Sequence, residues 1–341
     1  FAQAAAEVAK KGDFVWVHDY HLQLVPAMLR ELRPDVRIGF FLHIPFPPEE
    51  LFAWLPWREQ IIRGLLGADV VGFQTYAGAQ NFSRAARKYT PATGTDTQLE
   101  YEGRTIRTGS YPISIDFKDF EETAKKPSVV AAAESIRRNL GASRKIVLCV
   151  DRLDYTKGID QRLLSFELLL ERKAATVEDC VMVQIAVPSR EPVPEYAAMR
   201  RRIEQIVGRV NGDYSEPGRI AVHYFRRSFP RDQLVAYYLA ADVMLVTPYR
   251  DGMNLVAKEY VATRTDNSGV LVLSEFAGAA QEMRRALLVN PRDVDGMSAA
   301  MERAIHIDPA DAKQRMSILR TTIRRHDVFD WADSFIRAVQ P

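Results

Sequence analysis

The stretch VLCVDRLDYTKGIDQRL, residues 147–163, combines a short apolar run, a polar turn and the start of an amphipathic segment. An apolar run that ends at Val150 is typical of a buried strand, and the pattern from Ile159 to Arg172 has the spacing of a helix. The stretch therefore predicts a strand, a turn and a helix that starts near Gly158, which is the repeating unit of an α/β fold.

The same alternation continues in both directions along the chain. Further strands are expected at Asp13 to His18, Val36 to His43, Asp69 to Phe73, Lys145 to Val150, Cys180 to Val187, Ile220 to His223, Val243 to Thr247 and Gly269 to Ser274. Further helices are expected at Leu22 to Leu32, Tyr76 to Tyr89, Pro194 to Val210 and Arg231 to Ala241. This order predicts two parallel sheets with helices on both faces.

The predicted domains are 1–112, 113–326 and a final helix within 327–341. Polar alternation over Thr93 to Thr108 favours a hairpin that turns at Glu102 and Gly103. A polar helical connector, Phe117 to Leu140, then leads into the second sheet. The last helix, Val328 to Val339, carries an apolar stripe that either crosses back to the first domain or docks in an oligomer, and the sequence leaves this open.

Size and composition exclude several classes of protein. The 341 residues exceed what one hydrophobic core usually supports. Lys plus Arg total 46 and Asp plus Glu total 44, so the charges nearly balance. The chain therefore lacks the strong positive electrostatic field that attracts nucleic acid or an acidic membrane. The sequence shows no apolar stretch of about 20 residues and no signal peptide. Cys149 and Cys180 lie in strand-like runs, so we expect reduced thiols in a cytoplasmic protein.

Polar side chains follow two predicted strands of the first sheet. In FVWVHDYHLQLVP, residues 14–26, the cluster of His18, Asp19, Tyr20 and His21 follows a strand, and His43 follows the next strand in FFLHIPFPPEE. Ligands bind at such strand ends in parallel sheets, so Asp19 and His43 are candidate site residues. For His18 and His21 we favour a structural role at the start of the following helix. Their spacing matches no recognised zinc site, and we expect no metal.

Arg152 and Lys157 stand in the turn after the strand that ends at Val150. Two cations at this position suit a pyrophosphate. The alternative is that Arg152 pairs structurally with Asp151 or Asp154. The glycine-rich phosphate loops G-x-x-x-x-G-K-[ST] and G-x-G-x-x-G are both missing from the sequence.

The stretch VMLVTPYRDGMNLVAKEYVA, residues 243–262, predicts another strand, turn and helix. Gly252 permits a tight turn, and the N–H groups at the following helix start form a phosphate cradle. Asp251 suits sugar hydroxyls, and Glu259 could accept both hydroxyls of a ribose or, alternatively, pair with Arg264 or Lys258. The cradle residues are Met253, Asn254, Leu255 and Val256.

Two other predicted strands of the second sheet also end in candidate site residues or loops. LVLSEFAGAAQEM, residues 271–283, repeats the strand, turn and helix pattern, and Arg190 after the strand in VQIAVPSRE suggests a second phosphate to be held. Asp293 and Asp295 fit a metal-binding Asp-x-Asp pattern, but capping of the next helix is favoured.

These motifs together resemble the trehalose-6-phosphate synthase family. The resemblance rests on WVHDYHL, HIPFPPEE, DRLDYTKG, PSRE, RDGMNLVAKEY and LSEFAGAA, which occur in the family's order. It implies a fold of two facing Rossmann-like doubly wound domains (GT-B) and a retaining glycosyltransferase that needs no cofactor or metal. The implied reaction transfers glucose from UDP-glucose, or from ADP- or GDP-glucose, to glucose 6-phosphate, which gives trehalose 6-phosphate.

The resemblance also implies roles for individual residues. Asp19 and His43 would flank the sugar site, with Asp19 on the acceptor side, and Arg190 would hold the acceptor phosphate. The donor side would comprise Arg152 and Lys157 at the diphosphate, Asp251 at the glucose hydroxyls, Gly252 to Val256 at the phosphate, Glu259 at the ribose, and Phe229 and Arg231 at the base.

Some features of the family have no counterpart in this sequence. The family's N-terminal strand and glycine-containing loop have no counterpart, and the first sheet offers about three strands before its hairpin. We therefore expect an upstream segment of the first domain to be missing and turnover by the chain alone to be low. The rival hypotheses are a glucosylglycerol-phosphate synthase and a catalytically silent relative that binds sugar phosphate. A homo-oligomer also stays open.

Overall fold

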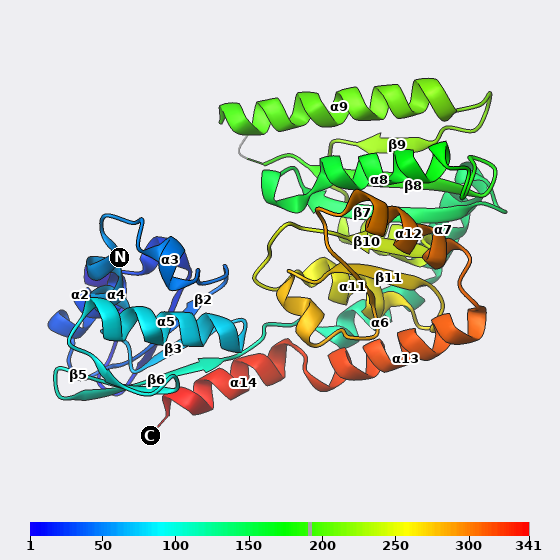
Figure 1. Cartoon of the computed structure of the whole chain (residues 1–341). Helices are drawn as coiled ribbons and strands as arrows, with labels where there is room; N and C mark the ends of the chain where they lie inside the picture. The colour runs from blue at the N-terminus through cyan, green and yellow to red at the C-terminus, as the bar shows by residue number, and fades with distance from the viewer. Residues whose placement is uncertain (190–192, 341) are drawn as a thin grey trace. The chain divides into compact units, whose positions relative to one another are not determined.

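The computed structural model describes residues 1–189 and 193–340, which form two units. One unit combines Phe1–Ile113 with the C-terminal segment from Val328, and the other comprises Ser114–Asp327. The predicted domain ends at 112 and 326 therefore lie one residue before the ends of these units. Figure 1 shows both units, with helices and strands labelled where there is room.

The first unit contains a mixed sheet with the strand order β1-β2-β3-β6-β5-β4. Strands β1, β2, β3 and β6 pair in parallel, whereas the pairs β6-β5 and β5-β4 are antiparallel. The predicted hairpin is confirmed as β5-β6, and its turn residues Glu102 and Gly103 have φ angles of 51° and 70°. The strands are β1 Phe14–His18, β2 Arg37–Leu42, β3 Val70–Phe73, β4 Thr93–Gly94, β5 Gln98–Tyr101 and β6 Arg104–Ser110.

Helices cover both faces of this sheet. They are needed on both faces because successive side chains of β2 point to opposite faces and are apolar on each. Phe40 lies in the larger core cluster and Phe41 in the smaller one. The larger cluster is covered by α1 Ala2–Val8, α2 Val25–Leu32, α3 Glu49–Phe52, α4 Arg58–Leu65 and α5 Tyr76–Tyr89. The expected helix over Leu22 to Leu32 is corrected: a 3-10 turn, Tyr20–Leu22, comes first, and α2 begins at Val25.

The C-terminal helix α14, Val328–Val339, covers the smaller cluster. Its Phe335 is fully buried, and its ring lies where β-carbons would stand if Gly39 of β2 and Gly72 of β3 were other residues. An added β-carbon would lie 2.7 Å from the ring at Gly39 and 2.5 Å at Gly72. The two glycines thus form a notch that accepts one aromatic side chain. Of the two possibilities left open, the structure has the helix packed on the first sheet.

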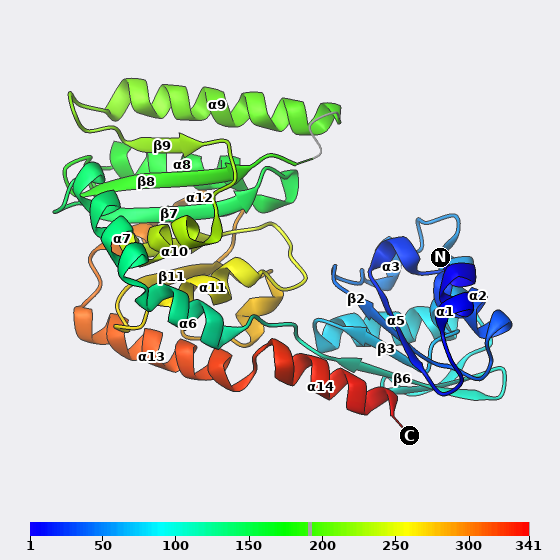
Figure 2. The same cartoon turned by 180° about the vertical axis from the view of Figure 1, so that it is seen from behind.

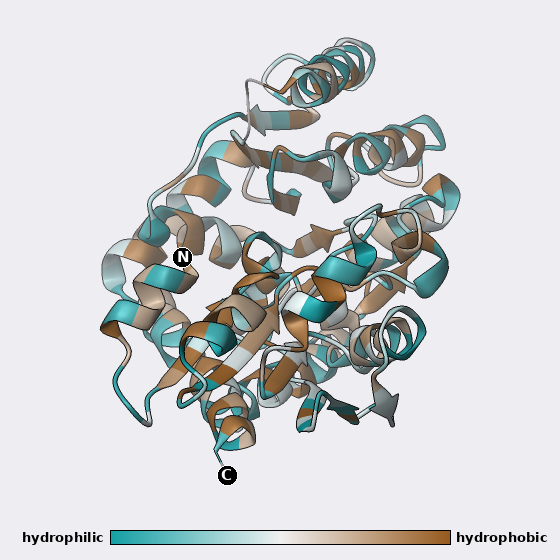
Figure 3. Ribbon diagram, turned by 90° about the vertical axis from the view of Figure 1, so that its left-hand side faces the viewer, coloured by the Kyte–Doolittle hydropathy of each residue, from teal (hydrophilic) through white to brown (hydrophobic). Residues whose placement is uncertain are grey.

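The second unit contains a parallel sheet with the strand order β12-β11-β10-β7-β8-β9. The core strands carry the predicted apolar runs and are buried, apart from the exposed ends of β7. Figure 3 shows in brown how apolar residues are distributed over the ribbon. The strands are β7 Lys145–Arg152, β8 Cys180–Val187, β9 Val222–Phe225, β10 Val243–Val246, β11 Val270–Ser274 and β12 Leu287–Val289.

Helices lie on both sides of this sheet. Helices α8 Ile159–Glu171, α9 Pro194–Tyr214 and α12 Val294–Ile305 share one core cluster (Figure 1). Figure 2 shows α6 Phe117–Lys125, α7 Pro127–Leu140 and α10 Arg231–Ala240 on the opposite side. The remaining helices are α11 Leu255–Thr263 and α13 Pro309–Arg325.

Two local expectations differ from the structure of this unit. The connector expected over Phe117 to Leu140 is two helices, because Pro127 begins α7 at a position where the missing N–H is tolerated. The segment after β11 forms a 3-10 turn, Gly278–Gln281, rather than a longer helix. The predicted capping role of Asp293 is confirmed, since its Oδ1 accepts a hydrogen bond from the Gly296 N–H at 2.8 Å.

Among residues 1–189 and 193–340, every helix is too short or too polar to cross a bilayer.

Candidate functional site

Arg152 is the last residue of β7, at the carboxyl edge of the second sheet. Its side chain is exposed and makes no hydrogen bond or ion pair with residues 1–189 or 193–340. Asp151 accepts a hydrogen bond from Arg162 at 2.5 Å, and Asp154 accepts one from the Thr156 N–H at 2.9 Å. The alternative in which Arg152 pairs with either aspartate is therefore wrong, and its guanidinium is left to bind an anion.

Lys157 lies five residues further on, at the end of a 3-10 turn, Tyr155–Lys157. Its Nζ is 2.5 Å from Oδ2 of Asp251, and both side chains are largely buried. Asn254 Nδ2 donates to the same carboxylate oxygen at 3.2 Å. Lys157, which was predicted to bind the diphosphate, is thus in contact with Asp251, which was predicted to bind the sugar hydroxyls.

The start of helix α11 has the geometry of a tight turn. Asn254 has a φ of 82°, and its Oδ1 accepts a hydrogen bond from the Ala257 N–H at 3.3 Å. A helix start leaves its first N–H groups without intrahelical acceptors, and a single cap satisfies only one of them. The backbone of Met253, Leu255 and Val256 therefore keeps the predicted capacity to bind a phosphate.

A second loop supports this turn from the side of β11. The Gly278 N–H donates to Asp251 O at 3.1 Å, and the Ala279 N–H donates to Met253 O at 2.9 Å. A β-carbon at Gly278 would lie 1.9 Å from the Gly252 carbonyl oxygen. Only glycine at 278 allows the two loops to approach this closely.

Glu259 is in the second turn of α11. Tyr238 of α10 donates its hydroxyl to Glu259 Oε2 at 2.8 Å, and burial raises the pKa of Glu259. The two alternative partners of Glu259 make other contacts. Lys258 pairs with Glu282 at 2.6 Å, and Arg264 donates to the backbone at the end of α10.

Phe229 and Arg231, the predicted base residues, precede and begin α10. The Phe229 ring is partly exposed, packs edge-on against Tyr237 at 5.1 Å between centroids, and has the Arg227 guanidinium 4.7 Å from its centroid. Arg231 forms an ion pair with Asp119 of α6. The Phe229 ring is thus already contacted by Arg227 and Tyr237 although it stays partly exposed, and Arg231 has a partner within the protein.

Arg162 is a functional candidate that the sequence reasoning missed. It is fully buried in α8 and donates to Asp151 on β7, to Gln184 Oε1 on β8 at 3.1 Å and to Thr247 Oγ1 after β10 at 3.0 Å. Its NH2 group also donates to the Lys157 carbonyl at 3.2 Å. Arg162 therefore ties the turn that carries Lys157 to β7, to β8 and to the residue after β10. An arginine on the apolar face of the predicted helix was the available signal.

In the first unit, Asp19 follows β1 with a φ of 69°, a conformation that costs energy for a residue other than glycine. Its N–H donates to Phe41 O at 2.8 Å, and its Oδ1 accepts from the His43 N–H at 3.3 Å. The two predicted residues Asp19 and His43 are therefore in contact. Strain of this kind is concentrated at functional sites.

His18 forms a pair with His43 that the sequence reasoning did not predict. Nδ1 of His18 lies 3.1 Å from Nε2 of His43, and the rings stack at 5.3 Å. Burial lowers the pKa of both imidazoles, which favours a neutral pair that shares one proton. Trp331 of α14 packs against both rings at 6.4 Å. The expected capping role is wrong for His18, and His21 stacks on Tyr20 instead of capping α2.

Arg190, the predicted acceptor-phosphate residue, lies outside the described residues. Within the described ranges, no group of three or more His, Cys, Asp or Glu side chains is arranged to hold a metal ion. Both cysteines are buried thiols without a disulfide, and burial raises their pKa values to about 12.

Parallel-sheet units with cations and helix N–H groups at their strand ends are typical of α/β proteins that bind phosphorylated ligands. The profile of glycosyltransferase family 20 matches residues 1–341, and the chain belongs to this family. The family resemblance of the motifs is thereby confirmed, together with a GT-B fold of parallel-sheet α/β domains.

The similar proteins agree with this assignment. A trehalose-6-phosphate synthase from Mycolicibacterium smegmatis is 53% identical over 99% of this chain and 69% of its own length. The crystal structure of an alpha,alpha-trehalose-phosphate synthase (UDP-forming) from Burkholderia xenovorans in complex with glucose-6-phosphate matches with a TM-score of 0.94 and 38% identity, over 100% of this chain and 76% of that chain. A structure from E. coli bound with UDP-2-fluoro glucose matches with a TM-score of 0.95 and 37% identity, over 99% and 75% of the two chains.

Proposed function

We propose that the protein transfers glucose from UDP-glucose to glucose 6-phosphate with retention of configuration and releases α,α-trehalose 6-phosphate and UDP. The relatives named for this activity cover nearly the whole chain, and similar structures hold glucose-6-phosphate or a UDP-glucose analogue. The observation that carries the proposal is the exposed guanidinium of Arg152, which has no hydrogen-bond or ion-pair partner among residues 1–189 and 193–340. It lies five residues before Lys157, whose Nζ contacts Asp251 just ahead of α11.

The chemistry asked of these groups is electrostatic. As the bond to the anomeric carbon breaks, negative charge grows on the departing diphosphate, and fixed donors lower the energy of that state. Arg152, Lys157 and the first N–H groups of α11 supply such donors. Asp251 holds Lys157 through Oδ2 and keeps Oδ1 for a sugar hydroxyl. The departing phosphate itself takes the acceptor proton, so the proposal needs no enzymic nucleophile.

On the acceptor side the proposal places Asp19 and His43 at the sugars and Arg190 at the 6-phosphate. The Asp19 N–H donates to the Phe41 carbonyl, and the Asp19 carboxylate accepts a hydrogen bond from the His43 N–H. The direction of the carboxylate is therefore set before a sugar binds. We also propose that no metal or other cofactor takes part, because Arg152 and Lys157 supply the positive charge. A rate that is unchanged by EDTA would support this part, and a rate restored by Mg²⁺ would contradict it.

The direct test is an assay of the purified chain with UDP-glucose and glucose 6-phosphate, in which both UDP and trehalose 6-phosphate are measured. Parallel reactions with ADP-glucose and GDP-glucose determine the donor, and glycerol 3-phosphate tests the glucosylglycerol-phosphate alternative. Trehalose 6-phosphate formed only with glucose 6-phosphate supports the proposal. Thermal stabilisation by glucose 6-phosphate without any turnover, both in the chain alone and in a fusion with the N-terminal strand and loop of a family member, would favour the silent relative.

We further propose a homo-oligomer in the cytoplasm. The segment around α3 exposes an unusual set of large apolar side chains, with Trp54 82% and Trp57 64% exposed. Exposed apolar clusters of this kind mark protein interfaces. Reduced buried cysteines and a sugar-nucleotide substrate suit the cytoplasm. Light scattering of the wild type and of a Trp54→Glu, Trp57→Glu variant tests the oligomer, and a monomeric wild type would contradict it.

A further inference from the structure

The hydroxyl of Tyr238 is the feature of the donor side that no predicted role explains. Tyr238 is fully buried, and the one hydrogen bond of its hydroxyl among the described residues is the donation to Glu259 Oε2 at 2.8 Å. The other carboxylate oxygen, Oε1, accepts no hydrogen bond from residues 1–189 or 193–340. One side of the carboxylate is therefore fixed and the other is open.

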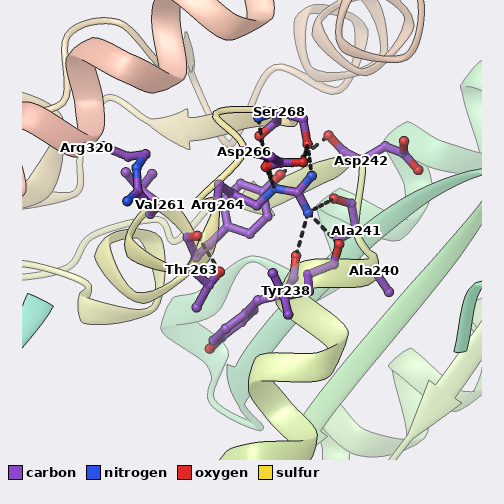
Figure 4. A network of polar contacts seen from close by, with 12 residues as sticks. Tyr238, Ala240, Ala241, Asp242, Val261, Thr263, Arg264, Asp266, Ser268 and Arg320 are labelled. Atoms are coloured by element: carbon purple, nitrogen blue, oxygen red, sulfur yellow. Dashed lines mark hydrogen bonds and ion pairs between the residues drawn. The ribbon is translucent and has the colours of Figure 1, made fainter. Parts of the chain in front are cut away.

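The main chain of Tyr238 is held as firmly as its side chain. Arg264 NH1 donates to the carbonyl oxygens of Tyr238, Leu239 and Ala241 at 3.1, 2.6 and 3.0 Å, which satisfies the last carbonyls of α10. Figure 4 shows this fan of hydrogen bonds, with Ser268 on the far side of the guanidinium. The Tyr238 ring also packs edge-on against Tyr260 at 6.4 Å. The position of the hydroxyl is thus set before any ligand arrives.

A carboxylate that accepts both hydroxyls of a ribose must present its two oxygens in one orientation. A glutamate side chain loses considerable rotamer freedom when it is held in that way, and a preorganised partner removes this cost from binding. We infer that Tyr238 is a positioning residue that orients Glu259 toward the 2′- and 3′-hydroxyls of the donor ribose, and so sets the preference for ribonucleotide over 2′-deoxyribonucleotide donors. This inference rests on the proposed function only through the assignment of Glu259 to the ribose.

The test compares binding of UDP and 2′-deoxy-UDP by calorimetry, which needs no turnover. A hydrogen bond to a charged group contributes enough to separate the two Kd values by about tenfold or more in the wild type. In Tyr238→Phe the carboxylate loses its anchor, and we expect UDP to bind about tenfold more weakly while the ratio of the two Kd values falls to about threefold or less. Tyr224→Phe is the matched control, because the Tyr224 hydroxyl is buried without a partner among the described residues.

Two further measurements separate the possible outcomes. Glu259→Gln keeps the shape of the side chain and an acceptor for Tyr238, and it should lose the ribose preference even if Tyr238→Phe fails to fold. An unchanged Kd ratio in either folded variant would overturn the inference and leave the proposed transfer reaction intact. If the wild type binds neither nucleotide, the proposed function itself fails. Steady-state rates with UDP-glucose should show a raised KM in Tyr238→Phe and a kcat within about threefold of the wild type, since the change does not touch the leaving phosphate.

Discussion

Two arginines ten positions apart differ completely in their surroundings. Arg152 is exposed without a partner among the described residues, whereas Arg162 is fully buried and bonded to Asp151 and Thr247. Arg162 forms a buried ion pair with Asp151, so the Asp151 carboxylate is not available to pair with Arg152. The exposed cation thus depends on the buried one for its availability to an anion.

We predict that Arg152→Ala lowers kcat/KM by about a hundredfold to a thousandfold, the usual effect of removing one donor to developing charge. Because the side chain is exposed, the free energy of unfolding should change by no more than about 0.5 kcal/mol. Steady-state assays and urea titration measure the two quantities. Arg172→Ala, which removes another exposed arginine of the same unit, is the control, and a fully active Arg152→Ala would contradict the prediction.

The histidine pair makes the stability of the first unit depend on pH. Burial lowers the pKa of His18 and His43 below the ordinary value of 6.5, His43 lowers that of His18 further, and Asp19 opposes both shifts. The unfolded chain therefore binds more protons than the folded one just below pH 6.5, so stability falls as the pH falls through this value. The loss ends once the pH is below the lowered pKa values.

We predict a lower unfolding temperature at about pH 5.5 than at about pH 7.5, and a weaker pH dependence in His18→Gln. Tryptophan fluorescence is a suitable measurement because Trp16 and Trp331 contact the His18 ring. His223 of the second unit, whose pKa burial also lowers, should leave a residual slope in the variant. An identical slope in wild type and variant would exclude the pair as its cause.

Sequence could identify the residues at strand ends but not their partners. Asp19, Arg152 and Asp251 were found because apolar runs end next to them, and strand ends of parallel sheets are where ligands bind. Tyr238 and His18 were missed because their roles depend on side chains 21 and 25 positions away. Such pairings are set by packing, which periodicity does not report.

At the scale of elements, the strands were predictable where β-branched residues fill a buried run, as in β8, and the helix α5 was predicted with its observed bounds. The turn after β11 was predicted less well. Its 3-10 geometry depends on hydrogen bonds to Asp251 and Met253 in another loop, so the local sequence alone could not decide it.

The contact between the loops of Gly252 and Gly278 leads to a prediction about the donor site. Gly278→Ala places a methyl group against the Gly252 carbonyl and must push apart the loops that position Asp251 and α11. We expect the KM for the donor to rise by about tenfold or more, since small displacements of positioning groups have large effects on rate and binding.

A glycine in open surroundings provides the comparison for this variant. Gly212 lies within α9 with nothing near an added methyl group, so Gly212→Ala should leave KM unchanged and stabilise the helix by about 0.5–1 kcal/mol. If both variants have the KM of the wild type, the close approach of the loops does not matter for the donor.

At the scale of the whole molecule, the C-terminal helix belongs to the unit that contains the N-terminus. The sequence predicted a stripe of Phe329, Trp331, Phe335 and Ile336, but a stripe does not identify the surface that covers it. In the structure Phe335 and Val339 are buried, whereas Phe329 is 61% exposed. Gly39 and Gly72, each within a predicted strand, form the complementary surface. Their role as a notch became apparent only once β2 and β3 were placed side by side.

We predict that Phe335→Ala lowers the free energy of unfolding of the first unit by about 3–5 kcal/mol, because a buried ring leaves a cavity between the helix and the sheet. The variant should also loosen Trp331 and the histidine pair, and thus reduce activity beyond the loss of folded protein. Denaturant titration followed by tryptophan fluorescence measures the first effect. Tyr76→Ala, which truncates an aromatic side chain that is 53% exposed in the same unit, should cost less than about 1 kcal/mol.

The place of α14 in the chain has a consequence for biosynthesis. A ribosome makes residues 114–327 between the strands that form the notch and the phenylalanine that fills it. During that interval the notch and the aromatic side chains around it face water. The unit that is translated first is therefore the last to acquire its complete core, and until then it is the part of the nascent protein most in need of protection from aggregation.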